Sequence, residues 1–334
     1  MHVTVISNQE VRKLLPMAEC IEVMAETFRA LGEGEALFPQ RSVMWQPDRK
    51  GALGLMPSWL GSPAALGAKI VSVFPGNADT PYESHQGAVL LFETANGRLQ
   101  AMVDAGAITA IRTAAVSALA TRLLAHGDAC DLAILGSGTQ AEMHLVAMQA
   151  IRPIKRVLVW SRSAEHARSF ADTASECHHM NVMPVDSPAA AVEGADLVCT
   201  VTGAREPVLR GEWLTPGTHI NAVGASVPSF RELDTKAVVC SRLFVDRTES
   251  AFAEADDIRI PLREKAIKKN HVQGELADLV LERVAGRVGP DDITLFKSVG
   301  IAVEDLAAAR YVYEQAEKKH TGTRVEFGAE RDSR

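Results

Sequence analysis

A glycine-rich turn in the segment LAILGSGTQA has the residue types and spacing that can hold an anionic ligand. Gly136, Gly138 and Ala141 form a G-x-G-x-x-A pattern that follows an apolar strand and opens a helix. The first glycine permits a tight turn, the second lets the backbone approach the ligand, and the small third residue keeps helix and strand close. Because the amino end of a helix attracts anions, the pattern predicts a dinucleotide pyrophosphate site that also includes Thr139 and Gln140.

The next predicted strand, RVLVW, ends in Ser161, Arg162 and Ser163. Sites that prefer NAD usually have Asp or Glu at this place, where the carboxylate binds the 2′-hydroxyl of the adenine ribose. A guanidinium between two hydroxyls can instead fork onto a 2′-phosphate and stack on adenine. The three residues favour NADPH/NADP+ as the cofactor, with NADH less favoured. The alternative is that Arg162 is only a solvated residue at a strand end.

Three basic residues stand among apolar neighbours, where a charge is costly unless an anion pairs with it. They are Arg41 in FPQRSVM, Lys69 in ALGAKIVSVF and Arg112 in AIRTAA. Burial lowers the pKa of a lysine, which would suit Lys69 for proton transfer. The alternatives are a surface position for Arg41, an edge-strand lysine that points to water for Lys69, and a structural ion pair for Arg112.

The first part of the chain reads as a mixture of helices and short strands. Residues 17–33 have apolar positions at helical spacing and end at glycines, which predicts a helix. Between 40 and 104, β-rich segments alternate with Gly and Pro, and Asn96-Gly97 predicts a hairpin. An alanine-rich helix follows at about 107–125. This texture predicts an α+β domain over residues 1–128.

From Cys130 onward, apolar strands alternate with predicted helices at 139–151 and 164–176. This alternation predicts a parallel sheet with crossover helices, and hence a Rossmann dinucleotide-binding domain over residues 129–302. Thr202 and Val223 follow two strands of that domain, at the carboxyl ends where an open α/β sheet binds its ligand. The fold class expected is therefore α/β.

Composition narrows the function classes. The chain has 334 residues, 47% of them hydrophobic, and a net charge of −7, which argues against binding nucleic acid. Its five cysteines are scattered, which predicts a reducing, cytoplasmic location rather than a disulfide framework. No signal peptide or membrane span is expected. No metal site is expected either, because the Cys177-His178-His179 trio ends a helix and lacks ligand spacing.

Several ordered motifs resemble the ornithine cyclodeaminase/mu-crystallin family over about residues 35–315. They are HQGAVLLFETANGRLQAMVD, ITAIRTAAVSALAT, THINAVGAS, RELD and FKSVGIAVEDLAAA. Within the family, the chain looks most like the mu-crystallin-like ketimine reductases. The resemblance implies a homodimer, in which the N-terminal domain binds substrate and forms the dimer together with a returning C-terminal helix at about 303–320.

The resemblance also implies roles for individual residues. Arg41 matches an arginine that holds the substrate carboxylate, and Lys69 matches the active-site lysine. Arg112 and Thr113 match a pair near the substrate and the cofactor phosphate, and Ser298 matches a position that contacts the nicotinamide end.

Ser226 marks a departure from part of the family. Cyclodeaminases and the alanine dehydrogenase have Gly-x-Asp in the equivalent segment, whereas this chain has Ser226 in VGASVP, as mu-crystallin does. A serine cannot act as a carboxylate base at neutral pH, so deamination of ornithine is disfavoured and Ser226 is expected to contact substrate.

The function expected is NADPH-dependent reduction of a C=N bond next to a carboxylate. The candidate substrates are cyclic ketimines such as Δ1-piperideine-2-carboxylate and Δ1-pyrroline-2-carboxylate. An ornithine or lysine cyclodeaminase, or an amino-acid dehydrogenase, is the alternative within the family. An NADPH-dependent protein that binds a small ligand is the alternative of another class.

Overall fold

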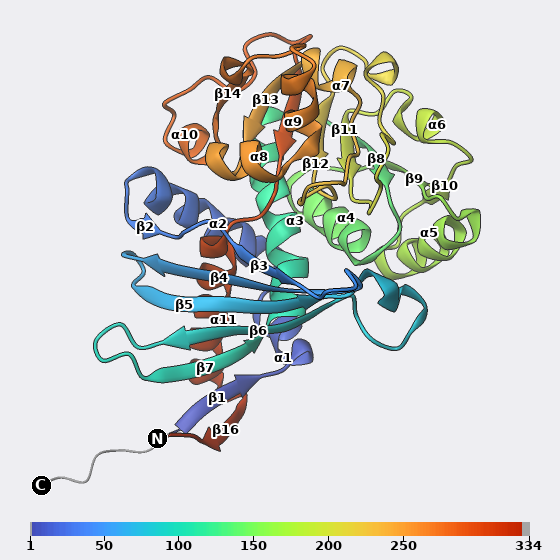
Figure 1. Cartoon of the computed structure of the whole chain (residues 1–334). Coiled ribbons are helices and arrows are strands. Elements are labelled where there is room, and N and C mark those ends of the chain that lie inside the picture. The colour runs from blue at the N-terminus through green and yellow to red at the C-terminus, as the bar shows by residue number, and fades with distance from the viewer. Residues whose placement is uncertain (1, 329–334) are drawn as a thin grey trace, which may run out of the picture. The chain divides into compact units, whose positions relative to one another are not determined.

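The computed structural model describes residues 2–328, which divide into two compact units (Figure 1). Unit 1 runs to Arg112 and resumes at Ile301, and unit 2 is Thr113–Gly300. The division falls inside helix α3 (Ala105–Leu124), whereas the sequence predicts a boundary at residue 128, where that helix has ended. A helix that serves both units gives the sequence pattern no break at the point of division.

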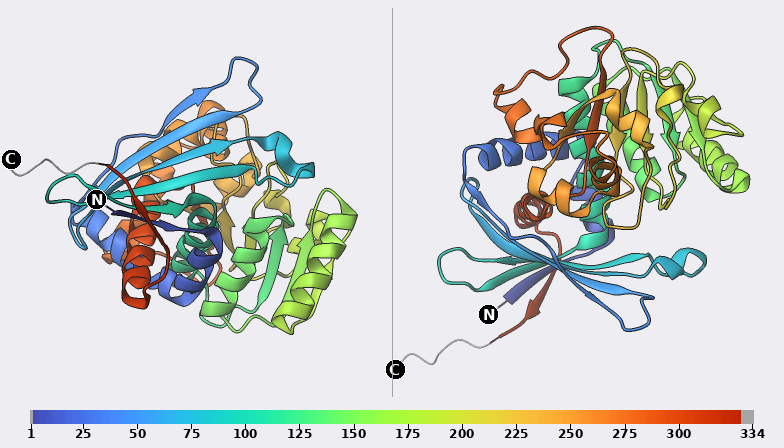
Figure 2. Two further views of the ribbon diagram at one scale, coloured as in Figure 1. Left: turned by 90° about the horizontal axis from the view of Figure 1, so that it is seen from below. Right: turned by 45° about the horizontal axis from the view of Figure 1, so that its top comes forward.

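Unit 1 contains an eight-stranded sheet in the order β16-β1-β7-β6-β5-β4-β2, with β3 paired to β4. Its strands are β1 (His2–Ile6), β2 (Ala36–Leu37), β3 (Ser42–Trp45), β4 (Ala52–Leu60), β5 (Ala65–Val73), β6 (His85–Phe92), β7 (Leu99–Asp104) and β16 (Thr323–Glu326). Its helices besides α3 are α1 (Asn8–Leu14), α2 (Met17–Gly32), the short η1 (Pro75–Asp79) and α11 (Ala302–Lys319). Strand β16 pairs with β1, so the first and last strands of the described chain lie side by side at one edge of the sheet (Figure 2).

Helix α11 packs against β4, β5 and β6 and covers one face of this sheet (Figure 1). Met56, Lys69 and Val89 lie side by side on neighbouring strands and are all buried on the same face. Gly67 permits the close approach of the helix, because a Cβ there would lie 2.8 Å from a Leu306 methyl carbon and 2.3 Å from the Leu90 carbonyl oxygen. The C-terminal helix therefore returns to the N-terminal sheet and closes its core.

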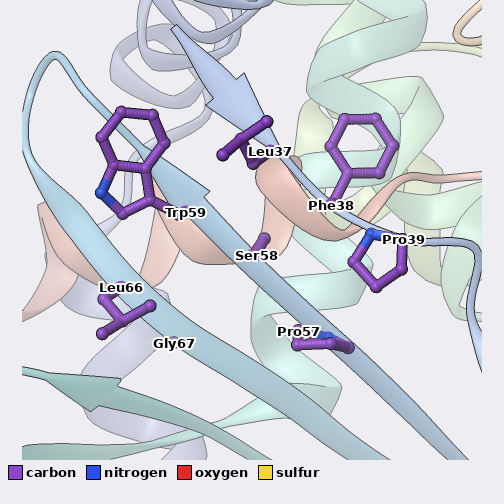
Figure 3. A pocket seen from close by; sticks show the side chains of 8 residues that line it. All are labelled: Leu37, Phe38, Pro39, Pro57, Ser58, Trp59, Leu66 and Gly67. Carbon is purple, nitrogen blue, oxygen red and sulfur yellow. The ribbon is translucent and has the colours of Figure 1, made fainter.

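The opposite face of the same strands is also apolar, and we call it the outer apolar face. It consists of Leu37, Met44, Leu53, Leu55 and Leu66, each at least 36% exposed. Figure 3 shows a shallow apolar depression on this side, between β2 and the β4–β5 pair. An antiparallel sheet with one face on a core usually presents polar side chains on the other. No described segment of unit 1 covers the outer apolar face.

Unit 2 contains an eight-stranded, all-parallel sheet in the order β10-β9-β8-β11-β12-β15-β13-β14. Its strands are β8 (Asp131–Leu135), β9 (Arg156–Trp160), β10 (Val182–Pro184), β11 (Leu197–Thr200), β12 (His219–Ala222), β13 (Ser241–Val245), β14 (Val272–Glu275) and β15 (Ile293–Lys297). The connecting helices are α4 (Thr139–Ile151), α5 (Ala164–His178), α6 (Pro188–Val192), α7 (Thr235–Val239), α8 (Thr248–Glu254), α9 (Asp256–Arg263) and α10 (Leu276–Val280), with short η2 (Gly211–Trp213) and η3 (Lys269–His271). The strand order reverses between β8 and β11, which is the point where a doubly wound sheet binds its ligand.

This architecture confirms the predicted fold class, an α/β protein with a Rossmann dinucleotide-binding domain. The helix predicted over 139–151 is α4, and the one predicted over 164–176 extends two residues further as α5. Buried apolar strands such as Leu197–Thr200 alternate with these helices because both faces of a parallel sheet are covered.

Among the described residues, α3 is the one helix long and apolar enough to cross a membrane, judged by length and composition. Within its most apolar stretch, 83% of the residues are buried inside the protein. Such burial is typical of the core helix of a globular protein. Length and composition alone do not distinguish such a helix from a membrane span.

Candidate functional site

The glycine turn of unit 2 has the backbone conformation that its pattern predicts. Gly136 has a φ of +130°, and a Cβ there would lie 2.8 Å from the carbonyl oxygen of Val201. Only glycine fits, because both the dihedral angle and the neighbouring strand exclude a side chain. Gly138 begins α4 as its N-cap, and a Cβ there would meet no protein atom within 4 Å. Buried Ala141 faces the sheet, so an anion has open access to the amino end of α4.

The next two residues of the turn open α4. Thr139 is exposed, and Gln140 is partly buried. The carboxamide oxygen of Gln140 is buried and has no hydrogen-bond partner among the described residues. The open backbone of the turn fits a dinucleotide pyrophosphate. The buried Gln140 oxygen is an acceptor, so it needs a hydrogen-bond donor and would not bind a phosphate itself.

Ser161, Arg162 and Ser163 follow β9, beside the glycine turn. Ser161 accepts a hydrogen bond of 2.9 Å from the Ser137 hydroxyl. Ser163 is the N-cap of α5, where its hydroxyl oxygen accepts the His166 backbone N–H at 3.3 Å. Arg162 is exposed. The hydroxyls of the two serines thus make hydrogen bonds within the fold, whereas Arg162 is exposed directly after β9.

The other predicted cofactor residues of unit 2 lie at the carboxyl ends of adjacent strands. The Thr202 hydroxyl and backbone N–H both donate to Glu232 Oε1, at 2.7 and 2.6 Å. Val223 is buried and follows β12 directly. Ser298 follows β15, and its hydroxyl donates to Asp246 at 3.4 Å. The hydroxyls of Thr202 and Ser298 are already hydrogen-bonded to carboxylates of the protein, and Val223 is buried. These residues can therefore contribute to the site mainly through their backbone.

Ser226 lies in the loop after β12 and is partly exposed. It belongs to unit 2, whereas the three predicted basic residues belong to unit 1. Thr113 is buried and is the first residue of unit 2, directly after Arg112 on α3.

Unit 1 brings the basic residues together around two acidic residues of α11. Lys69 projects from β5, is 5% exposed, and its Nζ lies 2.6 Å from Asp305 Oδ2. Its ammonium also donates to the Thr109 hydroxyl at 3.4 Å. Burial lowers the pKa of Lys69 to about 8, with the Asp305 charge opposing the shift and the Arg112 charge adding to it. The group therefore changes protonation close to neutral pH, as a proton donor must.

Arg112 is bound by carboxylates of the protein. Its Nε lies 2.9 Å from Asp305 Oδ1, and an Nη lies 2.6 Å from Glu304 Oε2. All three side chains are at most 5% exposed. Burial alone would raise the pKa of Asp305, yet the Arg112 and Lys69 charges outweigh it and hold that pKa below its ordinary value. The ion pairs orient Arg112 rigidly, which satisfies the requirement that a buried cation have an anionic partner.

Arg41 and His85 lie at the border of this cluster. Arg41 directly precedes β3 and is half-buried, and its charge contributes to the lowered pKa of Lys69. Desolvation, followed by the Lys69 and Arg112 charges, lowers the pKa of His85, although the residue is exposed. The predicted substrate residues of unit 1 thus form one group, with the His85 imidazole next to it.

Sequence reasoning missed the acidic partners in this group. Glu304 and Asp305 are fully buried in α11, within the stretch IAVEDLAAA. Two adjacent acidic residues among alanines and branched apolar residues are costly to bury alone. That signal could have paired them with Arg112, whose surroundings are equally apolar.

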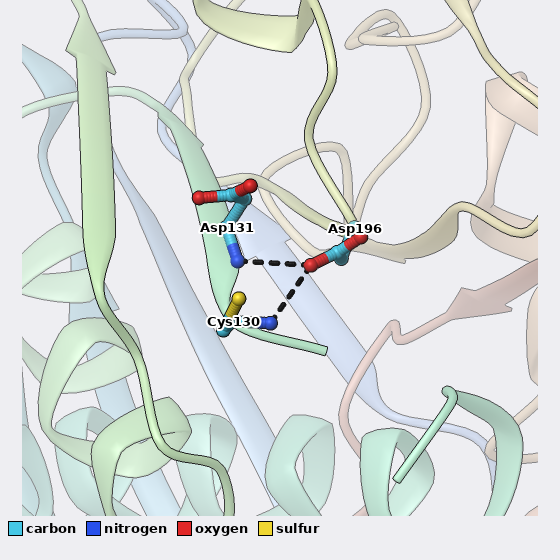
Figure 4. Close-up of side chains that lie close together, drawn as sticks. All are labelled: Cys130, Asp131 and Asp196. Carbon is cyan, nitrogen blue, oxygen red and sulfur yellow. Dashed lines mark hydrogen bonds between the residues drawn. The ribbon is translucent and has the colours of Figure 1, made fainter. Parts of the chain in front are cut away.

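Cys130, Asp131 and Asp196 also lie close together, with ligand-type atoms within 4.8 Å of one another (Figure 4). Asp196 accepts the backbone N–H groups of Cys130 and Asp131 at 2.8 and 3.0 Å, and Asp131 pairs with Arg156 at 3.0 Å. These contacts fix the start of β8, at the edge of the sheet opposite the glycine turn. The cluster is explained by the fold.

A parallel sheet whose strand order reverses next to an open glycine turn defines a dinucleotide-binding α/β protein. Unit 1 of this chain contains the buried cluster of Lys69 and carboxylates. Residues 1–320 match the model of the ornithine cyclodeaminase/mu-crystallin family. The chain belongs to this family, as its motifs predict.

Three relatives illustrate the similarity. The ketimine reductase mu-crystallin of Mus musculus is 39% identical over 294 residues, which cover 88% of this chain and 90% of the relative. A solved structure of the Δ1-pyrroline-2-carboxylate reductase of Thermococcus litoralis, in complex with NADH and L-proline, is 37% identical with a TM-score of 0.94. It covers 96% of this chain and 99% of its own. An archaeal alanine dehydrogenase dimer with bound NAD is 29% identical with a TM-score of 0.92, and covers 98% and 100% of the two chains.

Proposed function

We propose that the protein is an NADPH-dependent reductase of cyclic ketimines that carry a carboxylate next to the C=N bond. Δ1-Pyrroline-2-carboxylate and Δ1-piperideine-2-carboxylate are the candidate substrates, and the products are the corresponding cyclic amino acids. The observation that carries this proposal is the buried Lys69, which lies 2.6 Å from Asp305 and has a pKa of about 8. The names of the mouse and Thermococcus relatives support the same chemistry.

The charges of the unit 1 cluster suit an anionic substrate. Arg41, Lys69 and Arg112 bring three positive charges, and Glu304 and Asp305 bring two negative ones. A substrate carboxylate would be attracted to the cations of this group, and guanidinium groups bind carboxylates in a fixed orientation. Arg41 and Arg112 would hold the carboxylate, Lys69 would donate its proton to the imine nitrogen, and Asp305 would keep the ammonium oriented.

The cofactor supplies a hydride to the imine carbon when it is bound. Unit 2 provides the binding residues: Gly136, Gly138 and the amino end of α4 for the pyrophosphate, and Ser161 to Ser163 for the adenine ribose. Exposed Arg162 supports NADPH over NADH, because a guanidinium would neutralise a 2′-phosphate. No carboxylate stands at this place to repel that phosphate.

Ser226 supports reduction over deamination. Its hydroxyl cannot take the role of a carboxylate base, and Asp234, eight residues later, is engaged by the fold. Asp234 caps α7 by accepting the Ala237 N–H at 2.7 Å, and it accepts the Gly211 N–H at 2.9 Å.

We further propose that the protein is a cytoplasmic homodimer that forms through the outer apolar face of unit 1. A second copy would cover Leu37, Met44 and the exposed leucines of β4 and β5, which the described part of the chain leaves open. An archaeal relative is a dimer. The cytoplasmic location rests on the cysteines, none of which is in a disulfide: Cys20, Cys130, Cys177, Cys199 and Cys240.

The test is an absorbance assay at the nicotinamide band with each ketimine and either NADPH or NADH. Rapid oxidation of NADPH, with NADH clearly poorer, is the expected result. An Arg162→Ala variant should lose most of the preference for NADPH while keeping turnover with NADH. If neither cofactor is consumed with either imine, the reductase proposal fails; if NADH serves equally well, the role of Arg162 fails.

A further inference from the structure

A fully buried carboxylate joins two loops at the carboxyl edge of the unit 2 sheet. Glu232 Oε1 accepts the Thr202 N–H at 2.6 Å and the Thr202 hydroxyl at 2.7 Å. Oε2 accepts the Thr200 hydroxyl at 2.9 Å and the N–H groups of Gly224 and Ala225 at 2.8 and 3.3 Å. One side chain therefore receives five donors, from the ends of both β11 and β12.

Glu232 is itself held by a second buried carboxylate. Asp257 Oδ1 accepts the backbone N–H groups of Glu232 and Leu233 at 2.8 and 2.9 Å. Its other oxygen lies 2.9 Å from Nζ of Lys297, and both side chains are 1% exposed. Lys297 is the last residue of β15 and directly precedes Ser298. A continuous set of polar contacts thus connects the carboxyl ends of three adjacent strands.

The two loops are packed without spare room. A Cβ on Gly224 would lie 2.0 Å from the Thr202 carbonyl oxygen and 2.6 Å from Glu232 Oε1. Any side chain at this position would separate the loops and break the contacts to the carboxylate. The Glu232 network therefore fixes the backbone of residues 200–202 against that of residues 223–225.

The cost of this arrangement suggests a role beyond stability. Buried charges are expensive, and well-packed apolar residues can often replace them without loss of stability. Burial raises the pKa of Glu232, but the Lys297 charge and the hydrogen bonds from Thr202 oppose the rise. Three of its five donors are backbone N–H groups, which can only donate, so the ionised carboxylate fits the site best.

We propose that Glu232 is a positioning residue for the nicotinamide end of the cofactor. Because Glu232 is 0% exposed, it acts through Thr202 and Val223, the loop residues at the edge where an open α/β sheet binds its ligand. The contacts of Asp257 and Lys297 connect Glu232 to Ser298 and fix the backbone there as well. This inference rests on the proposed function. It states that Glu232 positions the residues around the nicotinamide half of the dinucleotide site and not those around the adenine half.

The test compares two ligands by titration calorimetry on the full-length protein. NADPH occupies both halves of the site, whereas adenosine 2′,5′-bisphosphate lacks the nicotinamide and occupies only the adenine half. In Glu232→Gln, whichever way the amide turns, its NH2 group faces at least two donors. We expect the Kd for NADPH to rise about tenfold, which corresponds to about 1.4 kcal/mol, and the Kd for the bisphosphate to stay unchanged.

A matched control is Asp196→Asn, at the amino end of the same sheet. Asp196 also accepts two backbone N–H groups, at 2.8 and 3.0 Å, but it precedes β11 instead of following it. This variant should bind both ligands as the wild type does. If Glu232→Gln does not fold, Asp257→Asn, which weakens the contact to Lys297, should produce a smaller loss for NADPH alone.

Two results would overturn the inference. NADPH bound equally well by Glu232→Gln and wild type would remove the positioning role. Equal losses for NADPH and the bisphosphate would make Glu232 a support of the whole unit. Failure of the wild type to bind NADPH is a separate result, which would remove the proposed function and with it the basis of this inference.

Discussion

At the scale of single residues, Lys69 shows how surroundings turn a common side chain into a reactive group. Desolvation lowers its pKa, and a carboxylate 2.6 Å away keeps the ammonium in one orientation. The same lysine on an exposed strand would stay protonated and mobile. Burial next to Asp305 would therefore supply both the proton affinity and the orientation that the proposed transfer to an imine nitrogen requires.

Replacing Lys69 with methionine should lower the turnover of ketimine reduction by about 100-fold or more. Methionine keeps most of the volume and apolar contact of the lysine stem but has no proton to donate. NADPH binding, measured by nicotinamide fluorescence, should change little. Lys50→Met, at a lysine 81% exposed, should leave both quantities as in the wild type. Unchanged turnover in Lys69→Met would contradict the proton-donor role.

The pH dependence of reduction should show the titration of Lys69. Because the donor must be protonated, and its pKa is about 8, kcat/KM should be level below that pH and fall as the pH rises through it. Steady-state rates across pH 6 to 10, corrected for the separately measured ionisation of the imine, check this. A profile still level at pH 10 would assign the proton to another group.

At the scale of elements, α11 carries the acidic residues that compensate the charges of a lysine and an arginine buried between this helix and the sheet. Glu304 and Asp305 occupy the first turn of the helix, and strand β5 and helix α3 bring Lys69 and Arg112 to them. The amino end of a helix also favours negative side chains. Three segments far apart in the chain thus form one charge cluster.

Asp305→Asn should lower the free energy of unfolding by about 3 kcal/mol, because it leaves the buried Lys69 ammonium with only a neutral amide at this place and Arg112 with one carboxylate instead of two. Urea unfolding followed by circular dichroism measures the loss. Glu314→Gln is the matched control on the same helix, since Glu314 pairs with Arg310 at 2.7 Å but is 37% exposed. That variant should lose at most about 0.5 kcal/mol. Equal effects of the two substitutions would mean that burial does not set the cost.

At the scale of the whole molecule, the sheet of unit 1 is apolar on both faces, and α11 covers only one of them. Scattered apolar residues on a surface are ordinary, but a continuous patch across four strands marks an interaction site. The patch would also expose a sheet to non-specific association if it stayed open in solution. The proposed self-association would cover the patch and so prevent non-specific association.

Paired Met44→Glu and Leu55→Glu substitutions should convert the proposed dimer into a species of the 35.9 kDa chain mass. Two buried carboxylates per copy would each lack a partner in the contact. Light scattering after size exclusion measures the mass. Val288→Glu, at a residue 64% exposed in unit 2, should leave the dimer intact. A wild type that is already monomeric at micromolar concentration would refute the proposed contact.

The local sequence pattern determined much of the fold and part of the candidate site. The glycine turn, the strand before it and the helix after it are neighbours in sequence, so the Rossmann fold and Gly136, Gly138 and Ala141 followed from spacing alone. The apolar neighbours of Lys69 and Arg112 likewise predicted that these two side chains are buried. These features depend on contacts within one or two elements, which periodicity and turn chemistry record.

Only the tertiary structure decided which charges meet. The contacts of Lys69 and Arg112 with Asp305 span 236 and 193 positions of the chain, and those of Thr202 with Glu232 span 30. A sequence pattern shows that a buried charge needs a partner, but long-range packing chooses it. The division within α3 was hidden for a related reason: a continuous helix satisfies its own backbone and gives no local sign that its two ends belong to different cores.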